Sequence, residues 1–240
     1  MKINVFNGSP RAEKGNTSVM VEAFLQGARD AGAETEHIFL THKKIHHCVG
    51  CFACWEKTPG VCAIKDDMAD LLRLMRESDI LVYASPVYVG GVTGIMKDFI
   101  DRVIPLADPH VVPGPNDTYR HPERYPFGVK TVLISNCGFP GQYHFKYFRS
   151  TFQYLVDHSS MTIMAEIYRG GGAILNNTSV FLAPTLNKYK ALLRAAGKEV
   201  VTDGKLSDST KEALEQPLIP PEIYLREGNK YWDSVAKRAV

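Results

Sequence analysis

The stretch KINVFNGSPRAEKGNTSV, residues 2–19, leads from a short apolar run into a polar loop that contains two glycines. Ile3 and Val5 predict a buried strand over residues 2–7, and apolar residues at helical spacing predict a helix over residues 17–31. A buried strand, a glycine-bearing loop and a helix in this order are typical of the start of a parallel α/β sheet. The loop of such a unit faces a ligand.

The same alternation of apolar runs and amphipathic stretches continues along the chain. Strands are predicted at residues 35–40, 79–85, 129–136 and 161–169, and helices at residues 66–78, 92–104, 144–159 and 184–201. Five buried strands that alternate with helices predict a doubly wound parallel sheet. Right-handed crossovers then place every strand-to-helix loop at one edge of the sheet, where ligands bind.

Composition limits the class of protein. With 240 residues, 45% of them hydrophobic and 22% charged, the chain is expected to form one core with room for an extension. A net charge of +2 without a dense Lys/Arg cluster disfavours nucleic-acid binding. No apolar run is long enough to cross a membrane, and the N-terminus does not resemble a signal peptide, so a cytoplasmic protein is expected.

We expect residues 1–204 to form the domain and residues 205–240 to form a C-terminal extension stiffened by prolines. The domain includes a cysteine-bearing loop at residues 41–65 and a long irregular segment at residues 105–128. Long loops in compact domains are usually functional. The second of these is therefore expected to cover a ligand or a neighbouring subunit.

The first loop, GSPRAEKGNTS at residues 8–18, matches neither of the two common nucleotide-binding motifs. Gly8 and Gly15 are too far apart for a Walker loop, Asn16 stands where that loop needs a lysine, and the dinucleotide fingerprint is absent. Hydroxyl and amide side chains at a helix N-terminus nevertheless suit a terminal monophosphate. The alternative is a polar turn that only caps the helix.

Two further loops follow the third and fourth predicted strands. The sequence SPVYVGG at residues 85–91 combines a stiffening proline with Tyr88 and a glycine pair, and NCGFPGQ at residues 136–142 is also aromatic and glycine-bearing. One phosphate-binding loop and two such loops at the same edge predict a site for a planar ring that carries a phosphate. Flavin mononucleotide (FMN) has this chemistry.

The segments GSPR…GNTS, SPVYVGGVTGIMKDFIDR and CGFPG together resemble the flavodoxin-like NAD(P)H-dependent FMN reductases over about residues 1–175. The resemblance implies a flavodoxin-like doubly wound sheet of five parallel strands in the order 2-1-3-4-5, with FMN as cofactor and NAD(P)H as substrate. It assigns the phosphate to Ser9, Arg11, Asn16, Thr17 and Ser18, the isoalloxazine ring to Pro86, Val87, Tyr88, Val89 and Gly90, and the closing contacts to Cys137, Gly138 and Phe139. No catalytic acid or base is assigned, since the flavin carries the chemistry.

Four cysteines, Cys48, Cys51, Cys54 and Cys62, form a compact C-x2-C-x2-C-x7-C run. Such a run suits a [4Fe–4S] cluster better than a zinc ribbon, which prefers two separated pairs. The segment CVGCFACWEKTPGVCAIKDDM resembles the iron-sulfur flavoprotein branch of the same superfamily, although Ala63 stands where ferredoxin runs have proline. That branch implies a homodimer or homotetramer. The alternatives are free thiols, a disulfide pair, or residues that pack the loop.

Charged residues near these cysteines have local interpretations. Asp66 and Asp67 are expected to cap the helix that follows them. Lys97, Asp98, Asp101 and Arg102 have the spacing of ion pairs within one helix.

Two functions from different classes are consistent with these motifs. The first is an enzyme that moves electrons from NAD(P)H through FMN to a small-molecule acceptor such as free flavin, a quinone or oxygen, or to a cluster. The second is an iron-sulfur flavoprotein electron carrier that accepts electrons from ferredoxin. Simple flavodoxin carriers are small and acidic, whereas this chain is longer and slightly basic. A scaffold on a degenerate flavin fold is disfavoured because the flavin loops are intact.

Overall fold

A computed structural model of the chain describes residues 1–115, 117–125 and 130–238. Its strands are β1 (Lys2–Asn7), β2 (Glu34–Phe39), β3 (Ile80–Pro86), β4 (Val112–Pro113), β5 (Tyr119–Arg120), β6 (Lys130–Asn136) and β7 (Thr162–Arg169). Its helices are α1 (Asn16–Asp30), α2 (Ala53–Glu56), α3 (Met68–Arg76), α4 (Gly94–Asp101), α5 (Lys146–Asp157), α6 (Ala183–Thr202), α7 (Asp208–Glu215) and α8 (Pro221–Ala236). Parts of three predicted elements lie outside the described residues: residue 129 of one strand, residues 116 and 126–128 of the long segment, and residues 239–240 of the C-terminal extension.

The central sheet has five parallel strands in the order β2-β1-β3-β6-β7, which confirms the predicted flavodoxin-like topology. The chain moves outward from β1 to β2 and then returns past β1 to β3. In register, Val5 of β1 pairs with His37 of β2 and with Val82 of β3. This reversal makes β1 and β3 neighbours, so that the loops after them open side by side at the carboxyl edge.

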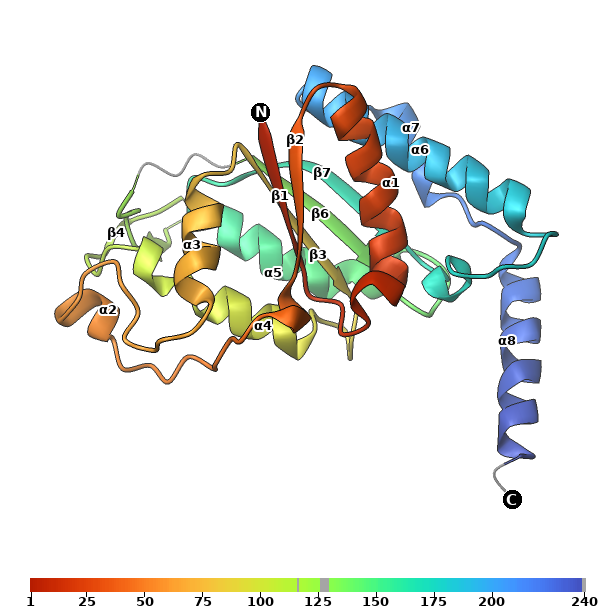
Figure 1. Cartoon of the computed structure of the whole chain (residues 1–240), viewed down its shortest axis with the longest axis horizontal. Helices are drawn as coiled ribbons and strands as arrows, with labels where there is room; N and C mark the ends of the chain where they lie inside the picture. The colour runs from red at the N-terminus through yellow and green to blue at the C-terminus, as the bar shows by residue number, and fades with distance from the viewer. Residues whose placement is uncertain (116, 126–129, 239–240) are drawn as a thin grey trace.

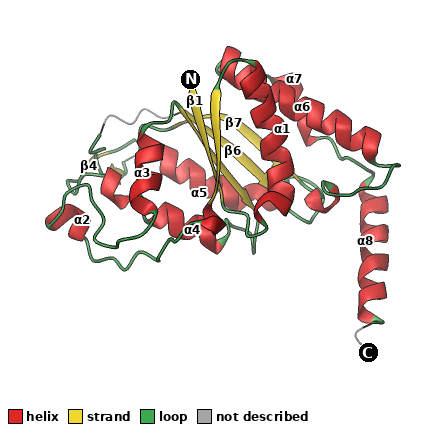
Figure 2. Ribbon diagram, in the orientation of Figure 1, coloured by secondary structure: helices red, strands yellow, loops and turns green. Residues whose placement is uncertain are grey.

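Helices cover both faces of the sheet, as Figure 2 shows. Helices α1, α6 and α7 lie on one face, where Phe24, Leu193 and Leu214 join a buried cluster with the strands. Helices α3, α4 and α5 lie on the other face, where a second cluster includes Phe99 and Phe148. The inner strands β3 and β6 are buried on both faces and so have nearly continuous hydrophobic sequences, which allowed their prediction.

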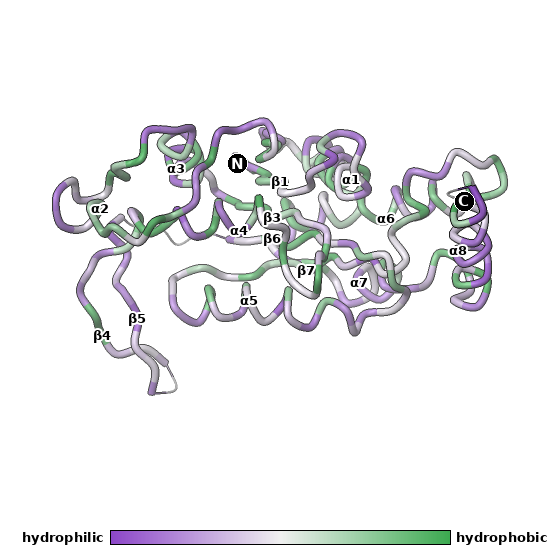
Figure 3. Tube along the Cα trace, turned by 90° about the horizontal axis from the view of Figure 1, so that it is seen from below, coloured by the Kyte–Doolittle hydropathy of each residue, from purple (hydrophilic) through white to green (hydrophobic). Residues whose placement is uncertain are grey.

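The long segment after α4 differs from the expected irregular loop, because β4 and β5 form a small antiparallel hairpin. Figure 3 shows this hairpin standing away from the sheet. The segment packs on the cysteine loop: the Trp55 ring lies 4.8 Å from that of His121, and Trp55 Nε1 donates to the Ala107 carbonyl at 2.9 Å. It therefore covers the cysteine loop within the same chain.

The predicted C-terminal extension consists of two different parts. Helix α7 packs on the body, with Leu214 in the core. Helix α8 starts in the predicted proline-rich stretch, has no buried residue, and projects from the body in Figure 1. The division at residue 204 stays a prediction. No helix among the described residues is long and apolar enough to cross a membrane.

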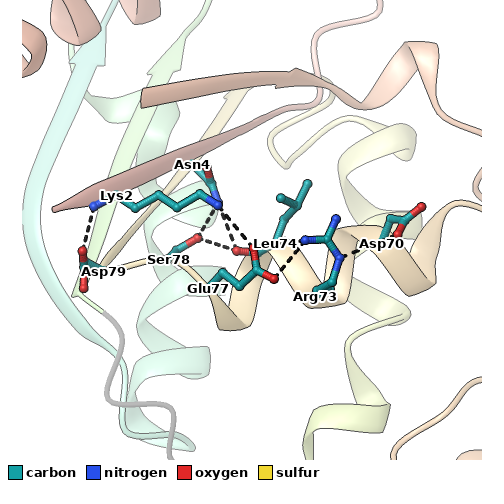
Figure 4. A network of polar contacts seen from close by, with 8 residues as sticks. All are labelled: Lys2, Asn4, Asp70, Arg73, Leu74, Glu77, Ser78 and Asp79. Carbon is teal, nitrogen blue, oxygen red and sulfur yellow. Dashed lines mark hydrogen bonds and ion pairs between the residues drawn. The ribbon is translucent and has the colours of Figure 1, made fainter. Parts of the chain in front are cut away.

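A polar network fixes the amino edge of the sheet. The Asn4 side-chain amide, buried in β1, donates to the Leu74 carbonyl at 3.0 Å and to Ser78 Oγ at 2.8 Å, both at the end of α3 (Figure 4). Because a buried amide needs such partners, these bonds hold α3 against the sheet. Nearer the surface, the Lys2 ammonium pairs with Glu77 at 3.3 Å, and the Lys2 backbone amide donates to Asp79 at 2.7 Å.

Candidate functional site

Hydrogen bonds bring the three predicted loops together at the carboxyl edge of the sheet. The Gly8 amide donates to the Ala84 carbonyl at 2.8 Å, and Thr93 Oγ1, at the N-cap of α4, donates to the Gly8 carbonyl at 2.6 Å. The Val87 amide donates to the Asn136 carbonyl at 2.8 Å, which joins the second loop to the third. The sequence predicted the loops, and the structure places them in mutual contact.

Two hydroxyls of the first loop keep a hydrogen to donate. Thr17 Oγ1 accepts from the Asn136 side-chain amide at 2.8 Å, and Ser9 Oγ accepts from the Arg11 amide at 3.4 Å. Since a hydroxyl has one donor and two acceptor positions, both O–H groups remain available to a ligand. Ser18 differs, because its hydroxyl already donates to the Ala12 carbonyl at 2.6 Å and so shapes the loop itself.

The start of α1 offers backbone donors to the same space. Gly15 is its N-cap, and no side chain accepts a hydrogen bond there. A Cβ at Gly15 would lie 2.5 Å from Ser9 Oγ and 3.1 Å from the Ala12 carbonyl oxygen. The absence of a side chain therefore keeps the loop closed around an uncapped helix N-terminus, which favours an anion. Asn16 is buried and accepts from Asn176 Nδ2 at 2.7 Å, whereas Arg11 is exposed.

The second loop is a tight turn with a strained tip. The amides of Tyr88 and Gly91 each donate to the other residue's carbonyl at 3.0 Å. Val89 at φ +48° and Gly90 at φ +83° occupy the left-handed region between them. This conformation is easy for glycine and unfavourable for a β-branched residue, and Val89 is also fully exposed. Pro86 is buried beneath the turn, and Tyr88 is half exposed.

The third loop combines a buried thiol with an exposed ring. Burial raises the pKa of the Cys137 thiol, which donates to the Phe139 carbonyl at 3.2 Å. Its burial and this hydrogen bond make Cys137 part of the packing of the loop. The Phe139 ring is exposed and stacks on His144 at 4.6 Å, and the Gly138 carbonyl accepts from the Tyr224 hydroxyl of α8 at 2.6 Å.

The structure adds a polar network that the sequence analysis missed. Asn7 Oδ1 accepts from the Ser9 amide at 2.9 Å, and Asn7 Nδ2 contacts Ser18 Oγ at 3.2 Å and His37 Nε2 at 2.9 Å. Glu22 contacts His37 Nδ1 at 2.6 Å. An amide nitrogen can only donate, so His37 is neutral with its proton on Nδ1. The sequence feature that could have indicated this network is the pair of asparagines, Asn7 and Asn136, at the ends of two buried strands.

We expect the free energy of unfolding to decrease as the pH falls from 7 to about 5, in part because of His37. Burial lowers the pKa of His37 below 6.5. This effect is larger than the raising effects of Glu22 and Glu13, and the charge of Arg29 lowers the pKa further. The unfolded chain therefore binds the proton more readily. The stability that neutral His37 gives is present above the unfolded pKa and is lost as pH falls through the lower folded pKa.

Urea unfolding at several pH values measures this effect. His37→Gln keeps an acceptor for Asn7 but cannot titrate, so its stability should fall less with acidification than that of the wild type. An unchanged slope in His37→Gln would contradict the prediction.

All four clustered cysteines line a single cavity beside the end of α4, together with Arg102 and Ile104. Cys54 is buried, Cys62 is half buried, and Cys48 and Cys51 are exposed. Burial raises the pKa of Cys54, and the three neighbouring thiols raise it further. Within the described residues no set of three or more His, Cys, Asp or Glu side chains is gathered as a metal site, and the cysteines are unpaired.

Helix α4 connects this cavity to the loops. Its N-cap, Thr93, contacts Gly8, and its C-cap, Arg102, lines the cysteine cavity. At about 1.5 Å per residue the two ends are about 14 Å apart. The predicted Lys97–Asp101 pair is present at 2.5 Å, but Arg102 pairs with Asp66, and Asp98 contacts His47. Arg102 was therefore wrongly expected to pair within its own helix.

Comparison with known proteins places these features in context. A model of the family described as NADPH-dependent FMN reductase matches residues 1–134. An iron-sulfur flavoprotein of Archaeoglobus fulgidus is 47% identical over 98 residues, which are 41% of this chain and 43% of that protein. A putative NAD(P)H-dependent FMN-containing oxidoreductase of Bacillus subtilis, YwqN, is 32% identical over 108 residues, 42% of this chain and 51% of that protein. The aligned stretches span about half the length of these curated relatives.

Solved structures support the fold. An FMN-dependent NADH-azoreductase of Bacillus anthracis, in complex with FMN, matches with a TM-score of 0.62 at 13% identity. The match covers 84% of this chain and 99% of that chain. At this level of identity, the likeness extends to the fold alone.

Proposed function

Because the chain belongs to the NADPH-dependent FMN reductase family, we propose that it is an FMN-dependent oxidoreductase that takes electrons from NAD(P)H and delivers them to an acceptor. The observation that carries the proposal is the contact among three loops at the carboxyl edge, one of which surrounds an uncapped helix N-terminus. Bound FMN would supply the redox chemistry, because it takes up two electrons together and releases them together or singly.

The first loop fits the phosphate of FMN. The donors are the free O–H groups of Ser9 and Thr17 and the first amides of α1, and all of them favour a negative charge. Arg11 adds an exposed positive charge beside them. The other polar side chains of the loop hold these donors in place, so that little rearrangement is needed on binding.

The second and third loops fit a planar ring. Tyr88, Phe139 and Tyr147 present exposed rings, and a Cβ at Gly90 would lie 3.7 Å from the Tyr147 ring. Exposed aromatic side chains gathered around a glycine turn offer stacking surface to an isoalloxazine and to a nicotinamide above it. Residues Pro86 to Gly90 and Cys137 to Phe139 are the proposed ring contacts.

The finer proposal is that Cys48, Cys51, Cys54 and Cys62 hold a [4Fe–4S] cluster, which would exchange one electron at a time. Four thiols on one cavity are the donor set that such clusters use. Arg102 also lines the cavity, and its buried Nε has no acceptor among the described residues, as expected beside a group that brings sulfur atoms. The Archaeoglobus relative, named an iron-sulfur flavoprotein, supports the same assignment.

The cysteine cavity favours a second candidate function. A protein with both groups could act as an electron carrier that accepts electrons from ferredoxin and needs no NAD(P)H. Assembly into a homodimer or homotetramer would then let a cluster approach the flavin of a neighbouring subunit.

Anaerobic purification followed by cofactor analysis tests these proposals. FMN is released by heat and identified by chromatography, iron and acid-labile sulfide are measured per chain, and oxidation of NADH and NADPH is followed with free flavin or a quinone as acceptor. We expect about one FMN per chain and steady-state oxidation of NAD(P)H.

The outcomes separate the functions. About four irons per chain would support the cluster. A protein that contains FMN and is reduced by ferredoxin but does not oxidise NAD(P)H would support the electron carrier and exclude the reductase. A protein that contains no FMN and does not bind added FMN would refute both.

A further inference from the structure

Arg102 joins the two ends of the cysteine loop. Its guanidinium donates to the two carboxylate oxygens of Asp66 at 2.8 and 2.9 Å, and to the His46 carbonyl at 2.6 Å. Asp66 also accepts from the amides of His46 at 2.9 Å and Met68 at 3.1 Å. His46 precedes the first cysteine and Asp66 follows the last, so one buried ion pair closes the base of the loop.

The same side chain faces the cysteines with a donor left over. Arg102 is 1% exposed and lines the cavity that all four cysteines share. Among the described residues its Nε is buried and has no hydrogen-bond partner, although its other bonds are well formed. A buried N–H that has no acceptor destabilises the folded state. The missing acceptor of Arg102 Nε therefore calls for an explanation.

The group that the cavity is suited to hold would supply that acceptor. Cys62 lines the same cavity as Arg102. Burial lowers the pKa of the guanidinium, and the hydrogen-bonded Asp66 carboxylate and the negative charge of a Cys62 thiolate raise it above its usual value. A cysteine bound to iron is a thiolate, which accepts hydrogen bonds. Hydrogen bonds to the sulfur atoms of a cluster favour its reduced, more negative state and so raise its reduction potential.

We infer that Arg102 is a positioning residue for the iron-sulfur site: its Nε–H donates to the Cys62 sulfur, orients that ligand and raises the reduction potential of the cluster. The inference rests on the proposed [4Fe–4S] function. Arginine suits this task because its planar group carries donors in fixed directions: two nitrogens bind Asp66 and the third points elsewhere. Lysine could pair with Asp66 but has no second, fixed donor.

The test compares wild type, Arg102→Lys and a matched control, Arg73→Lys. Arg73 lies exposed on α3, where it pairs with Glu77. Each purified holoprotein is assayed for iron and sulfide per chain, for the midpoint potential of the cluster by anaerobic titration, and for stability in urea. We expect Arg102→Lys to shift the potential to a more negative value and to lose iron faster to a chelator, while Arg73→Lys matches the wild type.

A second measurement needs no variant. In the reduced wild type labelled with 15N-arginine, pulsed electron paramagnetic resonance should detect a coupling between the cluster and one arginine nitrogen. This readout holds even where Arg102→Lys fails to fold, because it depends on the native contact.

Each result has one meaning. The inference is overturned, and the cluster stands, if the wild type holds four irons but shows no nitrogen coupling and has the same midpoint potential as Arg102→Lys. A wild type that holds no iron after anaerobic reconstitution refutes the cluster and the inference together, with the FMN proposal still standing. Destabilisation of Arg102→Lys with an unchanged potential and no coupling would reduce Arg102 to a structural clamp.

Discussion

Replacing Gly15 with valine is expected to weaken FMN binding by about 100-fold or more, a loss of about 2.7 kcal/mol. Its Cβ would lie 2.5 Å from Ser9 Oγ and 3.1 Å from the Ala12 carbonyl oxygen. Either the loop opens or Ser9 turns away, and the branched side chain then occupies the space in front of α1. Hydrogen bonds to a charged phosphate contribute about 1.5–3 kcal/mol each, so the loss of one or two gives this effect.

Titration of the apoprotein with FMN, followed by quenching of flavin fluorescence, measures the affinity. Gly228→Val is the control, because a Cβ there meets no atom within 4 Å and Gly228 is not among the proposed FMN contacts. Circular dichroism verifies that both variants are folded. A folded Gly15→Val protein with wild-type affinity would show that this loop does not hold the phosphate.

Replacing Gly27 with alanine is expected to destabilise the protein by about 3 kcal/mol, although glycine to alanine inside a helix usually stabilises by about 0.5–1 kcal/mol. A Cβ at Gly27 would lie 1.8 Å from the Arg194 carbonyl oxygen, and one at Gly197 would lie 1.9 Å from that of Phe24. At this crossing the backbones of α1 and α6 touch, so an added methyl group forces the helices apart.

Urea unfolding gives the free energy, and Gly228→Ala supplies the matched helical control. That variant should be as stable as the wild type or slightly more stable, since its surroundings are open. Because the proposed phosphate loop leads into the N-terminus of α1, Gly27→Ala should weaken FMN binding as well. Increased stability in Gly27→Ala would contradict the close crossing that the structure shows.

Much of the site was accessible from local sequence. Ser9, Thr17, Tyr88 and Phe139 lie on the loops that the strand and helix pattern placed at one edge, and the structure brings those loops together. Their partners were not accessible in the same way. His37 lies on β2 and contacts Asn7, which holds the first loop. This contact requires β1 and β2 to pair in one particular register.

The sequence by itself determined the layers of this protein. Apolar runs become strands buried on both faces, amphipathic stretches become the covering helices, and glycines mark the turns, because each of these preferences acts over a few neighbouring residues. The spacing of the four cysteines is likewise a local property, and the proposed cluster was inferred from it without knowledge of their surroundings.

Only the tertiary structure decided which charges and donors meet. Asp98 lies four residues before Arg102, at ion-pair spacing. Arg102 nevertheless pairs with Asp66, 36 residues earlier in the chain. Burial explains the choice: the end of α4 packs over the base of the cysteine loop, where a charge removed from water needs a partner that is buried with it. Such pairings depend on which elements the fold brings together, and short-range sequence patterns carry no information about that.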